Sequence, residues 1–128
     1  MSYNISRKTS GDFDTVIGRV KDALKTEGFG VLTEIDVAGT LKSKIGKDFR
    51  PYRILGACNP QFAYEALGAE PHIGVMLPCN VIVQRYDNGE IEVSSIDPTT
   101  AMQAVGNPTL APIADKVRAA LERVIETL

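Results

Sequence analysis

The stretch that decides the fold class is VIVQRYDNGEIEV, residues 81–93 of this 128-residue chain. Two runs of branched apolar residues, 81–83 and 91–93, flank the tripeptide Asp87-Asn88-Gly89. Asn and Gly tolerate the positive φ of a tight hairpin turn, and branched side chains favour extended backbone. The stretch therefore predicts two antiparallel strands joined by a short turn.

Upstream of this hairpin, the spacing of apolar residues changes from one element to the next. Residues 3–8 predict a strand, and a helix with apolar residues at i, i+3, i+4 follows from residue 12 to Gly28. Residues 29–35 alternate as in a strand, and Asp36 can cap a short helix that ends at Gly46. Residues 52–58 predict a third strand.

The rest of the chain adds two further helical regions and a helical turn. Pro60 begins a helix that we expect to end near residue 67, with Gly68 closing it. After the hairpin, Asp97-Pro98 predicts a helical turn, and residues 110–128 carry the apolar stripe of an amphipathic helix. Pro78 cannot donate to a sheet ladder, so pairing of the fourth strand is expected only from Cys79 onward.

This order predicts an α+β fold, with a curved antiparallel sheet and helices packed on one of its faces. The hairpin and the irregular crossovers favour that arrangement over a doubly wound parallel sheet. No linker, repeat or low-complexity run divides the chain, so we expect a single domain over residues 1–128. A sheet covered on one face leaves the other face open, which predicts a homodimer.

Composition narrows the range of partners. Fourteen Lys and Arg residues against sixteen Asp and Glu give a formal charge of −2, which argues against nucleic acid. No apolar run approaches the roughly 20 residues that cross a bilayer, so no membrane partner is expected. The first residues do not resemble a secretion signal, which predicts a cytoplasmic protein whose two cysteines are thiols.

Two segments join a cysteine to an asparagine: residues 56–60, GACNP, and residues 77–81, LPCNV. Cys58 stands at the end of a predicted strand and before a helix N-terminus, where the helix dipole favours the reactive thiolate. The alternative for both Cys58 and Cys79 is a small apolar filler, which is the commoner role of a free cysteine. The two strand ends should lie at the same edge of the sheet, so the cysteines are expected to approach each other.

Each of the two asparagines has a structural role as an alternative to a role in a site. Asn59 is favoured as an N-cap of the helix that follows it. Asn80 lies in a predicted strand beside Pro78, where it either satisfies a bulge or belongs to a site. The candidate ligand-binding residues are therefore Cys58, Asn59, Cys79 and Asn80.

The same segments resemble a known family. The runs 36–38 (DVA), 44–46 (KIG), 51–60 (PYRILGACNP) and 77–81 (LPCNV) are similar to the family called domain of unknown function 302, and the likeness covers nearly the whole chain. The resemblance implies a small bacterial or archaeal protein with a fold like that of the TATA-binding protein, in which helices lie across a curved antiparallel sheet, and it implies a dimer. It implies no established activity.

Other candidate chemistry is weaker. A metal site would need more ligands than Cys58, Cys79 and His72 supply, so no metal is expected, and the pattern names no cofactor. Arg50 and Arg53 are interpreted as charges on a solvated sheet edge, with an anion site as the alternative. The leading hypothesis is a binding module for a small anionic or sulfur-containing ligand; a ligand-free homodimeric interaction protein is second, and a thiol-dependent enzyme is third.

Overall fold

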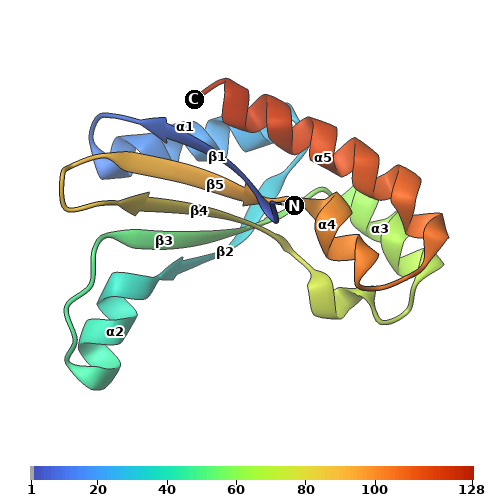
Figure 1. Cartoon of the computed structure of the whole chain (residues 1–128), viewed down its shortest axis with the longest axis horizontal. Helices are drawn as coiled ribbons and strands as arrows, with labels where there is room; N and C mark the ends of the chain where they lie inside the picture. The colour runs from blue at the N-terminus through green and yellow to red at the C-terminus, as the bar shows by residue number, and fades with distance from the viewer. Residues whose placement is uncertain (1) are drawn as a thin grey trace.

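The computed structural model describes residues 2–128 and contains one open sheet (Figure 1). Its five strands have the spatial order β1-β5-β4-β3-β2, and every neighbouring pair is antiparallel. The strands are β1 (Asn4–Thr9), β2 (Gly30–Asp36), β3 (Tyr52–Cys58), β4 (Cys79–Arg85) and β5 (Ile91–Ile96). The hairpin predicted at residues 81–93 is therefore the β4–β5 pair, and Gly89 takes the positive φ of its turn, 87°.

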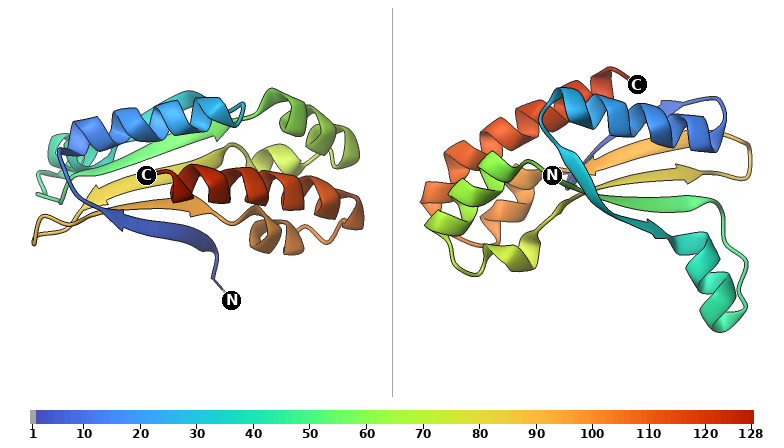
Figure 2. Two further views of the ribbon diagram at one scale, coloured as in Figure 1. Left: turned by 90° about the horizontal axis from the view of Figure 1, so that it is seen from above. Right: turned by 180° about the vertical axis from the view of Figure 1, so that it is seen from behind.

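The helices occupy three places around the sheet. Those described are α1 (Phe13–Thr26), α2 (Val37–Ile45), α3 (Pro60–Ala69), α4 (Pro98–Gln103) and α5 (Ala111–Glu126), with 3-10 turns η1 (Ile73–Met76) and η2 (Pro108–Leu110). α1 and α5 run side by side across one sheet face, while α3, α4 and η1 gather beyond one end of the strands (Figure 2). α2 extends from the sheet on the side away from α1 and α5 (Figure 1).

The main core lies between the sheet and the pair α1 and α5. Strand alternation directs Leu55, Val81, Val83 and Val93 toward these helices, and each is fully buried. The helices contribute Val16, Val20, Leu24, Leu121 and Val124, which share one helical stripe in each case. This packing confirms the predicted α+β class and places the two helices on one face.

Two local expectations were wrong. α3 continues through Gly68 to Ala69 and ends at Glu70, whose extended backbone precedes Pro71. β4 pairs with β3 without a register shift, so no bulge stands beside Pro78. The bulge is in β2 instead, where Leu32 is left between the paired residues Val31 and Thr33.

The arginine pair also lies elsewhere than expected. β3 is bonded to β2 on one side and to β4 on the other, so Arg53 is on an interior strand and the solvated-edge interpretation is wrong. Arg53 instead forms an ion pair with Glu34 at 2.5 Å. Arg50 lies over the rings of Phe49, Tyr52 and Tyr86 and donates to Gln84.

Candidate functional site

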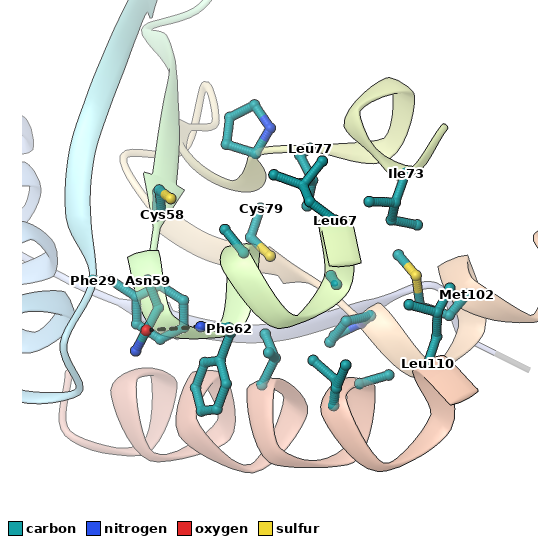
Figure 3. Close-up of a pocket in the computed structure, with 18 of the residues that line it drawn as sticks. Phe29, Cys58, Asn59, Phe62, Leu67, Ile73, Leu77, Cys79, Met102 and Leu110 are labelled. Atoms are coloured by element: carbon teal, nitrogen blue, oxygen red, sulfur yellow. Dashed lines mark hydrogen bonds between the residues drawn. The ribbon is translucent and has the colours of Figure 1, made fainter. Parts of the chain in front are cut away.

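A cavity of about 330 Å³ lies where the strands end and the short helices begin. Its walls come from the ends of β3 and β4 and from α3, η1, α4 and α5 (Figure 3). Apolar side chains supply nearly all of the surface, and none of the described lining residues is charged. The space is therefore suited to carbon-rich molecules rather than to ions.

The cavity exists because small side chains stand where the walls face each other. Ala57 on β3, Ala63 and Ala66 on α3, and Ala114 on α5 all line it. Ala57, Ala66 and Ala114 are buried, so their methyl groups leave space that larger side chains would fill. Larger residues close the far side: Ile73, Met102, Leu110 and Ile113.

The mouth of the cavity is marked by exposed apolar side chains. Leu32 is 69% exposed and Leu67 is 47% exposed, although both line the cavity. Leu32 is the unpaired bulge residue of β2, so the irregularity in that strand turns this side chain toward the opening. Leu77 and Pro78 complete the rim from the segment that leads into β4.

Both cysteines line this cavity, at the end of the sheet where β3 ends and β4 begins (Figure 3). The register pairs Cys79 with Ala57, so Cys58 is one residue beyond the directly opposite position. Alternation along β3 turns the side chain of Cys58 away from that of Ala57. The two sulfurs thus contact the cavity from different sides of β3, and both thiols are free.

The two thiols differ in environment. Burial, with a smaller contribution from the nearby Cys58, raises the pKa of Cys79 from 9.0 to about 11. Cys79 also packs against the main core. Cys79 is therefore a protonated thiol at neutral pH. Both cysteines are half-buried, and Cys58 is the last residue of β3.

Asn59 has the capping role that the sequence favoured. Its Oδ1 accepts from the backbone N–H groups of Gln61 and Phe62, and its Nδ2 donates to the carbonyl of Glu27. A Cβ at Gly28 would lie 2.9 Å from Nδ2, and Gly28 has a φ of +81°. Asn59 therefore joins the start of α3 to the end of α1 at the cavity wall.

The fourth candidate, Asn80, lies outside the cavity. It pairs with Gly56, is exposed, and by strand alternation faces the side of the sheet opposite Cys79. The structure thus brings Cys58, Asn59 and Cys79 together and leaves Asn80 on the uncovered face. Cys79 and Asn80 are adjacent in β4, so alternation turns their side chains to opposite faces of the sheet, and only Cys79 lines the cavity.

Side chains that could bind a metal ion or act as a general base are scarce around the cavity. Within residues 2–128, no group of three or more His, Cys, Asp or Glu residues is placed to hold a metal ion. The His72 side chain is 92% exposed, lies 3.6 Å from the Glu70 carboxylate and does not line the cavity. The described walls contain no histidine or carboxylate that would serve the cysteines as a base.

A second hollow lies between α1 and β2, and its walls are charged. Lys21, Asp22, Lys25 and Glu34 line it. The Nζ of Lys21 is 2.6 Å from a Glu34 oxygen, and Glu34 also pairs with Arg53. These charges are largely neutralised by one another, so we regard the apolar cavity as the candidate functional site.

Sequence reasoning identified one end of the cavity and missed most of its walls. The missed residues include Leu32, Ala63, Ala66, Met102 and Ala114. The three alanines and the methionine among them lie on helices, where periodicity ranks them as ordinary core residues, and Leu32 lies in a strand. Only the packing of α3 and α4 against α5 shows that these side chains do not fill the space between them.

The geometry defines the class of the molecule: an α+β protein with an open antiparallel sheet and an apolar cavity at the strand ends. The chain belongs to the family described as domain of unknown function DUF302, which matches residues 5–128. A crystal structure described as an uncharacterized conserved protein DUF302 from Bacillus stearothermophilus has a TM-score of 0.92 with this chain. The two are 31% identical, and the match covers 98% of each chain.

Two further findings complete the comparison. No curated protein matches the chain. In the part of the chain that the structure describes, no helix combines the length and apolar character needed to cross a membrane.

Proposed function

We propose that this protein is a binding module for a small apolar molecule, held in the cavity between α3, α4, α5 and the ends of β3 and β4. The observation that carries the proposal is the cavity's size together with its carbon-rich walls. Small-molecule pockets span roughly 300–1,000 Å³ and are mostly apolar, with few polar groups. At about 330 Å³, this cavity falls at the lower end of that range.

The chemistry of the walls narrows the ligand class. An anionic ligand would need a cation or free N–H donors, and the described walls offer no Lys or Arg. The N–H groups of Gln61 and Phe62 already donate to Asn59. Of the two ligand types expected from sequence, a sulfur-containing or otherwise soft apolar molecule suits these walls better than an anion.

The energetics of the cavity point the same way. An unfilled space with apolar walls costs stability, because the lining atoms lose dispersion contacts and water gains few hydrogen bonds there. A molecule that fills the space recovers those contacts. Ligand binding would therefore stabilise the folded state by an amount set by ligand concentration and affinity.

The test is a fluorescence titration with N-phenyl-1-naphthylamine, a neutral apolar fluorophore that brightens in apolar surroundings. We expect saturable binding to the native protein and a rise in its melting temperature. Ala114→Leu, which places a larger side chain in the cavity, should weaken binding by about tenfold or more. Ala119→Leu is the matched control, because Ala119 is exposed on the same helix and should leave binding unchanged. Equal binding by both variants would refute the proposal.

A second candidate function, assembly as a homodimer, is favoured by the uncovered side of the sheet. Ile35, Ile54 and Ile82 occupy one row of that face, and Ile35 is 47% exposed. α2 buries none of its residues, Ile45 at its end is 62% exposed, and nearby Phe49 is 42% exposed. A second copy of the chain would cover this apolar row and this helix together.

Sedimentation velocity at micromolar concentration tests this assembly. We expect twice the 13.8 kDa chain mass, and we expect Ile45→Glu to shift the protein to monomer. Val75→Glu is the control, because Val75 is 86% exposed on η1, away from α2. A native protein that sediments only as monomer would exclude the dimer and leave the binding proposal intact.

A further inference from the structure

Two nucleophilic side chains line the cavity in the described part of the chain, and one of them also packs against the main core. They are Cys58 and Cys79. Cys79 packs against the main core, and burial raises the pKa of its thiol. Cys58 is half-buried and lies at the end of β3 beside the mouth residues Leu32 and Pro78. A ligand that enters the mouth therefore meets Cys58.

The remaining walls limit what this thiol can do. Acyl transfer would need an acid to protonate the leaving group and a base to activate the water that releases the acyl group, and the described walls contain no histidine or carboxylate. The amide of Asn59 is already bonded to the Glu27 carbonyl, and no charged side chain lines the cavity. Disulfide exchange between the two cysteines is opposed by β3, which directs their side chains to different sides.

Addition to an electron-poor double bond makes the fewest demands on such a site. The reaction has no leaving group and needs no oxidant, metal or fixed base. The thiol loses its proton to water, and its sulfur forms a bond to the β carbon. The π electrons of the C=C bond shift to form an enolate, whose charge is shared by the carbonyl oxygen and the α carbon, and the α carbon then takes a proton from water.

We propose that the cavity takes an apolar chain that ends in an α,β-unsaturated carbonyl group, and that Cys58 captures this group as a thioether. The inference rests on the proposed apolar binding function and adds a reactive group to the ligand. The apolar tail occupies the walls from Ala66 to Met102, which holds the double bond beside the sulfur at the mouth. The rate gain comes from this positioning, so it should depend on tail length.

The experiment compares two aldehydes with the same reactive group: trans-2-nonenal, with a long tail, and trans-2-butenal, with a short one. Adducts are quantified over time by intact mass and located by peptide mapping, on the native protein and on the urea-unfolded chain. In the native protein, Cys58 should react with nonenal at least about tenfold faster than with butenal, after normalisation to the unfolded chain. Cys79 should remain unmodified over the same time.

Four variants distinguish the contribution of the thiol to labelling from the contribution of the cavity. Cys58→Ser should abolish native-state labelling, whereas Cys79→Ser should retain it. Ala114→Leu should reduce the preference for the long tail, and Ala119→Leu should not. Equal normalised rates for the two aldehydes, or labelling at Cys79 alone, would overturn the proposal.

The outcome is distinguishable from failure of the binding function itself. If N-phenyl-1-naphthylamine binds in a manner sensitive to Ala114→Leu but Cys58 shows no tail-length preference, the binding module stands and covalent capture is wrong. If the fluorophore does not bind, both proposals fall. Prior saturation with the fluorophore should slow nonenal labelling of Cys58 and leave butenal labelling of the unfolded chain unchanged.

Discussion

The two halves of α5 cover different interiors. Toward its C-terminus, Ala120, Leu121 and Val124 pack against the sheet in the main core, and each is at most 2% exposed. Toward its N-terminus, Ile113 and Ala114 border the cavity. One continuous helix with one apolar stripe therefore covers a filled core at one end and a hollow at the other.

The difference lies in what faces the helix rather than in the helix itself. The C-terminal half meets branched residues of the central strands, such as Val81 and Val93, which are fully buried. The N-terminal half meets Ala63 and Ala66 across the cavity. The size of the side chains on the opposing element thus decides whether the apolar stripe of an amphipathic helix contacts a packed core or borders a cavity.

The largest expected effect comes from truncating one leucine in the packed core and, for comparison, one leucine at the cavity mouth. Leu121→Ala should lower the free energy of unfolding by about 2–5 kcal/mol, because the packed core cannot collapse around the lost atoms. Leu67→Ala at the cavity mouth should cost less than about 1 kcal/mol, since Leu67 is already 47% exposed. Urea unfolding of both variants measures the two losses in the free energy of unfolding. Equal losses would contradict the distinction between the two interiors.

Cys79 lies at the boundary between the main core and the cavity, and its ionisation should make the stability of the protein depend on alkaline pH. Its pKa is raised from 9.0 to about 11 in the folded state, so between these values the folded protein keeps a proton that the unfolded chain releases. Stability from this group is full below pH 9.0 and falls as the pH rises toward about 11, by roughly 2 kcal/mol in all.

The control for this effect is Cys79→Ala, which removes the titrating group and leaves the other groups that titrate at alkaline pH. Urea unfolding of both proteins between about pH 8 and about pH 11 measures the difference in slope. The native protein should lose stability more steeply than Cys79→Ala. Parallel curves would mean that Cys79 is not buried as described.

A smaller effect is expected at the cap that fixes the cavity wall. Asn59→Ala removes two accepted N–H bonds at the start of α3 and the bond to the Glu27 carbonyl, and it should cost about 1–2 kcal/mol. Asp12→Ala, which removes the N-cap bond to the Thr15 N–H at the start of α1, is the comparison. Both variants should lose stability, but only Asn59→Ala should also bind the fluorophore more weakly. Thermal unfolding and titration on the same samples measure both.

The fold was largely predictable because its signals are local. The Asp87-Asn88-Gly89 turn, the caps at Asp36 and Asn59, and the apolar stripes of α1 and α5 each follow from residues a few positions apart. The bulge at Leu32 was not predictable in this way. It arises from the register between β2 and β3, which depends on residues that are distant in sequence.

The candidate site was predictable only at its cysteine end. Adjacent strands bring Cys58 and Cys79 to one end of the sheet, which the order of elements already indicated. The cavity is a property of volume, however, and an alanine such as Ala114 gives the same apolar signal whether its neighbours fill the space or not. Asn80 was grouped with Cys79 by sequence proximity, although the period of a strand separates them.

The measurement that tests the central claim most directly is the same substitution at two positions of α5. Ala114→Leu adds atoms where the cavity has room and should raise the free energy of unfolding by up to about 1 kcal/mol. Ala120→Leu adds the same atoms to the packed core and should lower it by about 1–3 kcal/mol. Ala119→Leu on the exposed face corrects for helix propensity. Opposite signs for Ala114→Leu and Ala120→Leu are the predicted result, and equal destabilisation by both would show that the N-terminal half of α5 covers no usable cavity.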